Sequence, residues 1–182
     1  MAGESRVSLW RTKEAQLRAW VEAGPGRGSS MGKHGFTPLW VAIVSLQSLP
    51  LVVWLLDEKC ADVSGATTLD GRTPLHYATR LDILVALLNR CADPTQQAKG
   101  EISLMTQALY DRVDNVAHQL QDPRVRDTIN AQEDMHGLTA LRGTESTSTI
   151  LLLHQAGANP AIPDTDEGET LLTWHRRERP NH

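Results

Sequence analysis

The chain has 182 residues, of which 40% are hydrophobic and 22% charged, and its formal net charge at neutral pH is −4. This size and composition are typical of one folded domain and not of a disordered chain. The acidic balance argues against a nucleic-acid-binding surface. No stretch reaches the roughly 18 uninterrupted apolar residues that would predict a membrane span.

The first predicted element is a helix over residues 9–24. Leu17, Trp20 and Val21 share one helical face, and Gly24 stands where a helix would end. The segment is amphipathic and charged, unlike the apolar centre of a signal peptide. Because the chain also has only two cysteines, we expect it in the reducing cytoplasm.

A glycine-rich stretch follows, from Gly24 to Lys33. It differs from a phosphate-binding Walker loop at two positions: Arg27 stands where a glycine is needed, and His34 follows the lysine instead of Ser or Thr. We therefore predict a long turn here and no nucleotide cofactor.

A short motif then recurs along the chain. Gly35-Phe-Thr-Pro-Leu and Gly71-Arg-Thr-Pro-Leu are its clearest copies, and weaker copies start at Gly100, Gly137 and Gly168. These glycines are 36, 29, 37 and 31 residues apart, so the mean period is about 33. The pattern indicates a tandem repeat.

A second marker supports the same repeat. Four of the motifs follow an apolar helical pattern that ends in a small residue, namely Gly24, Cys60, Cys91 or Gly157. The next motif glycine lies 9 or 11 residues further on. Two markers at a nearly constant offset define a helix, a turn and a second helix.

The motif residues explain how each helix begins. Glycine allows a tight turn with positive φ, threonine caps the helix, and proline suits its first position. The copies at Gly71 and Gly137 are shorter between their helices, so we expect their first helices to lose about one turn. Residues 142–149 are poor helix formers and should be the least regular part.

These motifs resemble the ankyrin-repeat family, most closely at Gly71-Arg-Thr-Pro-Leu-His-Tyr-Ala and Cys91-Ala-Asp-Pro. The resemblance covers about residues 9–178 and implies an all-α solenoid of about four helix-turn-helix repeats. The repeats would start near residues 35, 71, 100 and 137, between half-repeat caps at 9–24 and 168–178. Since such repeats must stack to bury their apolar faces, we expect residues 1–182 to form a single domain.

Two residue types invite a search for chemistry. Cys60 and Cys91 lack a second Cys or His at metal-ligand spacing. We therefore predict no metal site and two free thiols, buried as small hydrophobic side chains. The resemblance implies a structural role for His76, which would bond to the neighbouring turn.

The resemblance also implies a function. In the family, the turn tips and the exposed positions of the first helices form a concave surface that binds other proteins. The residues that map to this surface are Asp70, Arg72, Tyr77, Lys99, Glu101, Asp134, Met135, Leu138, Glu167, Glu169 and Trp174. Tyr77 and Trp174 are the best anchors, because aromatic residues dominate interface energies.

We therefore predict a non-catalytic module, an adaptor or inhibitor, that binds another protein as a monomer or weak homo-oligomer. An immunity or antidote protein is the main alternative, with acidic turns that oppose the basic cleft of a toxin or effector. An enzyme is less favoured. His175 lies near Asp164 and Asp166 in the predicted turns, but no nucleophile accompanies them.

Overall fold

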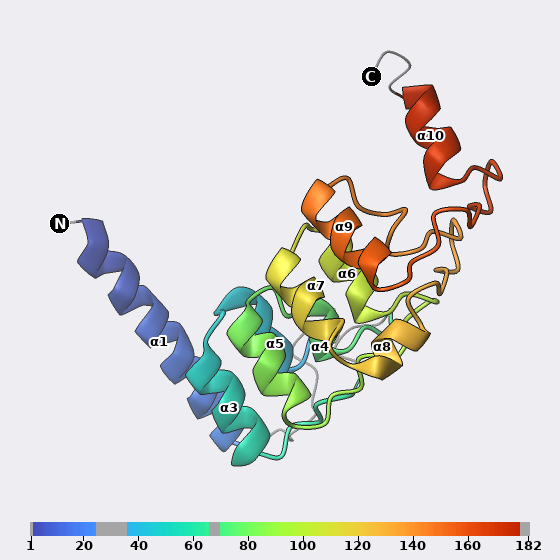
Figure 1. Cartoon of the computed structure of the whole chain (residues 1–182). Helices are drawn as coiled ribbons and strands as arrows, with labels where there is room; N and C mark the ends of the chain where they lie inside the picture. Colours follow the sequence, from blue (N-terminus) through green and yellow to red (C-terminus); the bar gives the residue numbers. More distant parts are fainter. Residues whose placement is uncertain (1, 25–35, 66–69, 179–182) are drawn as a thin grey trace. The chain divides into compact units, whose positions relative to one another are not determined.

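The described secondary-structure elements of the chain are helices (Figure 1). This computed structural model describes residues 2–24, 36–65 and 70–178, without the side chains of residues 2–11, 175 and 178. Within those ranges no strand forms beyond isolated bridges such as Ala98–Glu101. The predicted all-α class is confirmed.

The chain divides into two compact units, Met1–Ala92 and Asp93–His182. Each unit has its own cluster of buried apolar side chains. The expectation that residues 1–182 act as a single domain stays a prediction. The long turn was predicted over residues 24–33, and all of it after Gly24 lies outside the described residues, as does the first motif glycine, Gly35.

In its described residues, unit 1 contains one long helix followed by two short helix pairs. The elements are α1 (Ala2–Glu22), α2 (Pro38–Trp40) continued by a π-helical turn η1 (Val41–Ser45), α3 (Leu49–Asp57), α4 (Pro74–Tyr77) and α5 (Leu81–Leu88). The second helices, α3 and α5, contact each other and supply the centre of the core. Its fully buried side chains include Leu51, Val52, Leu55, Ile83, Leu84 and Leu87. Each contributes about 1.5–3 kcal/mol by leaving water.

The helix α1 covers one side of the unit 1 core. Leu17 is buried, Val21 packs against the core, and Trp20 is half-buried. The guanidinium of Arg18 lies 4.3 Å from the ring centroid of Trp54 on α3. The helix begins at Ala2, so the predicted start at residue 9 was wrong. Residues 2–8 include good helix formers and no proline, and nothing in them stops the helix.

The helix starts follow the motif chemistry. The Thr37 hydroxyl accepts a hydrogen bond from the Trp40 N–H at 3.2 Å, and Pro38 occupies the first turn. Thr73 and buried His76 form a reciprocal cap, in which His76 Nδ1 accepts from the Thr73 N–H at 3.2 Å. Both threonine caps and the structural role of His76 are confirmed. The α4 helix has 4 residues, and it is one turn shorter than the helical segment over residues 38–45, as expected.

Unit 2 contains five helices within its described residues. They are α6 (Ser103–Leu109), α7 (Val113–Gln119), α8 (Pro123–Asp127), α9 (Thr147–Gln155) and α10 (Leu171–Glu178). Buried Ile102 takes the place of the capping threonine before α6. No α-helix forms between Gly137 and Ser146, so residues 142–146 are irregular as predicted. Residues 147–149, predicted to be irregular as well, belong to α9, and for them the prediction was wrong. The sequence analysis did not predict α8, which Asp122 caps by accepting from the Arg124 N–H at 2.9 Å.

The two cysteines differ from the prediction. Both thiols are free, as expected, but both side chains are exposed, so their predicted burial was wrong. Cys60 has φ +51° and Cys91 has φ +63°, the left-handed conformation that glycine favours at helix ends. In that position each side chain points into solvent and not into the helix stack.

Candidate protein-binding surface

The three predicted residues of unit 1 already have partners within the chain. Arg72 Nε lies 3.4 Å from Asp70 Oδ2. The half-buried Tyr77 ring meets the Trp40 ring edge to face, with centroids 6.0 Å apart. Trp40 in turn stacks on Phe36 at 3.8 Å. Tyr77 is therefore part of an aromatic cluster and exposes only part of its ring.

In unit 2, three turns lie side by side and are joined by hydrogen bonds. The turns are residues 98–101, 132–138 and 163–169. The Asp134 N–H donates to the Lys99 carbonyl at 3.0 Å, and the Thr165 N–H donates to the His136 carbonyl at 2.8 Å. The Gln132 side-chain amide donates to the Pro163 carbonyl at 2.9 Å. These bonds fix the turns relative to one another.

Two carboxylates of these turns act as backbone caps. Glu133 accepts hydrogen bonds from the Met135, His136 and Leu138 N–H groups, at 2.7, 2.7 and 3.2 Å. Desolvation raises the pKa of Glu133, but these bonds outweigh it and the pKa is lowered overall. Asp164 accepts from the Glu167 and Glu169 N–H groups at 3.0 and 3.2 Å. The Glu167 bond is the main reason that the pKa of Asp164 is lowered.

A histidine joins two of the turns. His136 Nδ1 lies 2.7 Å from Asp166 Oδ2, and both side chains are about half exposed. This hydrogen bond raises the pKa of His136 above its usual 6.5. The sequence analysis found no role for His136 and considered His175 beside the same acidic run. The His175 side chain lies outside the described residues.

Arginine side chains contact the predicted residues Glu167, Glu169 and Trp174, which lie on α10 and in the turn before it. The Arg142 guanidinium lies 4.5 Å from the centroid of the Trp174 ring, and its Nη2 is 3.5 Å from Asp164 Oδ2. Arg177 pairs with Glu169 at 3.1 Å and also with Glu167. Trp174, Glu167 and Glu169 are therefore held by side chains of the same unit.

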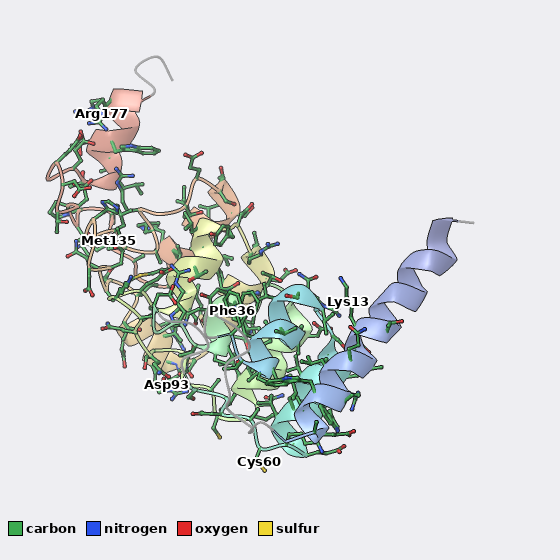
Figure 2. The ribbon with its side chains drawn as sticks, turned by 180° about the vertical axis from the view of Figure 1, so that it is seen from behind. Lys13, Phe36, Cys60, Asp93, Met135 and Arg177 are labelled. Atoms are coloured by element: carbon green, nitrogen blue, oxygen red, sulfur yellow. The ribbon has the colours of Figure 1, made fainter. Side chains whose placement is uncertain are left out.

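The remaining predicted residues differ in their access to solvent. Glu101 is half-buried and its carboxylate accepts from the Thr106 hydroxyl at 2.6 Å, and Leu138 is half-buried as well. Lys99 and Asp134 are exposed, and Met135 exposes 67% of its surface (Figure 2). We call Lys99, Asp134 and Met135 the turn surface, since the structure brings these three together at neighbouring, hydrogen-bonded turns.

None of the described helices is both long and apolar enough to cross a membrane. The same part of the chain contains no group of three or more His, Cys, Asp or Glu side chains that could hold a metal ion.

Comparison with known proteins gives two matches. The family model for the ankyrin repeat matches residues 70–99, which include the Thr73–His76 cap and α5. The ANK repeat-containing protein nipk-1 of Caenorhabditis elegans is 27% identical over 141 residues, which cover 76% of this chain and 20% of that protein. The chain thus spans about a fifth of the length of this relative. The repeat motif, the helical fold and both matches agree that the chain is similar to ankyrin-repeat proteins, with the family model matching the repeat at residues 70–99.

Proposed function

We propose that the chain is a non-catalytic interaction module, an adaptor or inhibitor in the cytoplasm, and that its turn surface binds a partner protein. Ankyrin repeats generally mediate protein–protein interaction, and this chain contains a segment that matches the ankyrin-repeat model. The observation that carries the proposal is the exposed Met135 side chain, held on a turn that is hydrogen-bonded to both neighbouring turns.

The arrangement has two properties of a binding surface. Because the turns are already fixed, a partner would not have to order them, and binding would lose less conformational entropy. Methionine is flexible and polarizable, which suits it to contacts with apolar side chains of a partner. Lys99 and Asp134 beside it carry opposite charges and would orient the partner.

The paired residues contribute differently to this proposal. Tyr77 and Trp174 each expose only part of their rings, since Trp40 and Arg142 cover the rest. We therefore give Met135, and not these two aromatic residues, the role of central anchor. The acidic residues Glu133 and Asp164 are engaged as caps, so they support an opposing basic cleft less than the bare sequence suggests.

The test is Met135→Asp, which places a charge at the centre of the turn surface. The matched control is Leu151→Asp, because Leu151 is a large apolar side chain on α9 that is 54% exposed. Both variants and the unaltered chain are used as bait in native extract, and the captured proteins are quantified. We expect a protein that is captured by the unaltered chain and by Leu151→Asp, and lost with Met135→Asp.

If Met135→Asp retains all the proteins that the unaltered chain captures, the turn surface is not the binding site. If Leu151→Asp loses the partner and Met135→Asp keeps it, the binding face lies on the second helices instead. Circular dichroism of each variant establishes that it is folded before the capture is interpreted.

A further inference from the structure

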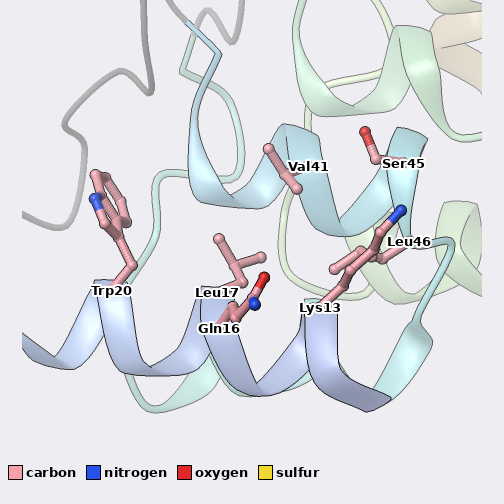
Figure 3. Close-up of a pocket in the computed structure, with 7 residues that line it drawn as sticks. All are labelled: Lys13, Gln16, Leu17, Trp20, Val41, Ser45 and Leu46. Atoms are coloured by element: carbon pink, nitrogen blue, oxygen red, sulfur yellow. The ribbon is translucent and has the colours of Figure 1, made fainter. Parts of the chain in front are cut away.

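Unit 1 has a groove between its long first helix and the π-helical turn. It has a volume of about 360 Å³, within the roughly 300–1,000 Å³ typical of binding pockets. Its lining residues are Lys13, Gln16, Leu17 and Trp20 of α1, Val41 and Ser45 of η1, and Leu46. Figure 3 shows Leu17 and Val41 on opposite walls, directed toward each other. We call this the α1–η1 groove.

The wall formed by η1 has an unusual backbone. Five residues, Val41–Ser45, form a π-helix at the point where an ankyrin repeat would continue its first α-helix. Such turns are rare, and many of them occur at functional sites. Val41 and Ser45 both line the groove. The departure from α-helix therefore coincides with the groove.

The groove also lies at the end of a row of helices. On one side, α2 and η1 pack against α4, the first helix of the next pair. On the other side, Val41 and Ser45 face the groove and α1. The α1 helix occupies the place of a second helix, because its Arg18 stacks on Trp54 of α3. A first helix to accompany α1 would lie in the groove.

The residues of α1 cannot themselves supply this helix. The helix runs without a break from Ala2 to Glu22 (Figure 1), a length of about 31 Å at 1.5 Å per residue. The chain immediately before Lys13 therefore continues along the same axis and does not fold back over Val41 and Ser45. The residues of α1 before Lys13 therefore do not fill the groove.

We propose that the α1–η1 groove is a second docking surface, which takes a short amphipathic helix of a partner protein. The helix lies where a further first helix would extend the row formed by η1 and α4, with aliphatic side chains against Leu17, Val41 and Leu46. This mode of binding places apolar anchors of a helix in an apolar groove. The groove is separate from the turn surface, so each of the two proposals can fail without the other.

The chain itself provides a probe for the groove. Residues 37–46 form the first helix that packs on α4, so a peptide of this sequence has the shape of one more member of the row. Because so short a helix is marginal in water, the peptide carries an i, i+4 hydrocarbon bridge on its outer face, a charged solubilising tag and a fluorescent label. Binding to the full chain is measured by fluorescence anisotropy.

The key variant is Ser45→Phe, since Ser45 is exposed and a phenyl ring there would fill the groove without entering the core. The matched control is Ser148→Phe, at an exposed serine of α9. We expect Ser45→Phe to weaken peptide binding at least about tenfold, which corresponds to 1.4 kcal/mol. Ser148→Phe should leave the affinity within about twofold.

Three results would overturn the proposal. One is no binding of the bridged peptide to the unaltered chain up to about 1 mM, the weak limit of a specific complex. Another is equal binding to Ser45→Phe and Ser148→Phe. The third is concentration-dependent dimerisation of the unaltered chain, measured by sedimentation, that Ser45→Phe abolishes; the occupant would then be a second copy. Binding by Met135→Asp should stay unchanged, which separates this test from that of the turn surface.

Discussion

His136 and Asp166 connect two turns that are 30 residues apart in the chain, through a hydrogen bond of 2.7 Å between Nδ1 and Oδ2. The backbone supports the same connection, because the Thr165 N–H donates to the His136 carbonyl. The carboxylate of Glu133 caps the turn that holds His136. A histidine whose pKa is raised by its partner is therefore placed at the junction of two turns.

The first prediction concerns the protonation of His136. Its pKa is raised in the folded chain, mainly by the hydrogen bond to Asp166. Stabilisation from this pair should be full below the unfolded pKa of about 6.5 and be lost as the pH rises through the folded pKa. Because both side chains are about half exposed, the effect on stability should be small. An NMR titration of the histidine ring measures the pKa directly.

The matched pair of variants for this titration is Asp166→Asn and Asp134→Asn. Asp166→Asn should lower the pKa of His136 toward its usual value, since the partner charge is removed. Asp134→Asn removes an exposed carboxylate on the same turn as His136 and should change that pKa much less. Equal shifts in the two variants would mean that the general field of the acidic turns, and not the hydrogen bond, raises the pKa.

The second prediction concerns Cys91, which has φ +63°. Cys91→Gly should raise the free energy of unfolding by about 0.5–1 kcal/mol. A left-handed residue other than glycine costs about 1–2 kcal/mol, and the greater freedom of glycine in the unfolded chain offsets roughly 0.5–1 kcal/mol of that gain. Cys91→Ala is the control, because alanine removes the thiol and keeps the strain. Urea unfolding followed by circular dichroism compares the unaltered chain, Cys91→Gly and Cys91→Ala. If Cys91→Ala were also more stable than the unaltered chain, the thiol and not the backbone strain would be the cause.

The contrast between the caps and the cysteines shows what the sequence could predict. A Thr-Pro pair and a glycine act on the backbone next to them, so the helix starts followed directly from the motif. The burial of Cys60 and Cys91 was inferred from residue type alone. Their φ angles decide the direction of the side chains, and the family position, usually glycine, was the signal that could have corrected the inference.

The contacts between turns could not be predicted from the sequence, for a different reason. Asp164 was expected in an acidic turn, and Glu133 and His136 had no assigned role. Their partners are set by which backbone N–H groups converge within a turn, and by which turns stack side by side. A local signal did exist for α8, where Asp122 precedes Pro123, and it was missed because the family pattern has no helix there.

The third prediction concerns the cap of α4. Thr73→Ala should lower the free energy of unfolding of unit 1 by about 1 kcal/mol, the usual cost of removing a capping hydroxyl. The loss arises because buried backbone N–H groups of the first turn lose their acceptor. Ser148→Ala is the comparison, because it removes an exposed hydroxyl that serves as no cap. Chemical unfolding of both variants and the unaltered chain checks the prediction. If Thr73→Ala were as stable as the unaltered chain, His76 alone would maintain the turn.

The final prediction compares three glycines of unit 2 that all have positive φ. A Cβ on Gly100 would lie 2.5 Å from Asp134 Oδ1 and 2.8 Å from Asp134 N, and one on Gly137 would lie 2.9 Å from Thr165 N. Those two nitrogens donate the hydrogen bonds that join the three turns. Gly168 has φ +66° as well, but nothing lies within 4 Å of its added Cβ.

Gly168→Ala should therefore lower the free energy of unfolding only by the strain of a left-handed alanine, about 1–2 kcal/mol. Alanine at Gly100 or Gly137 should cost a further 1–3 kcal/mol or so, because the backbone of the neighbouring turn must move. The same movement should displace Met135, so partner capture should fall with Gly100→Ala and not with Gly168→Ala. Urea unfolding measures the first effect and quantitative capture the second. If the three alanine variants were equally stable, the neighbouring turns could move without loss of stability, and the turn surface would not be rigid.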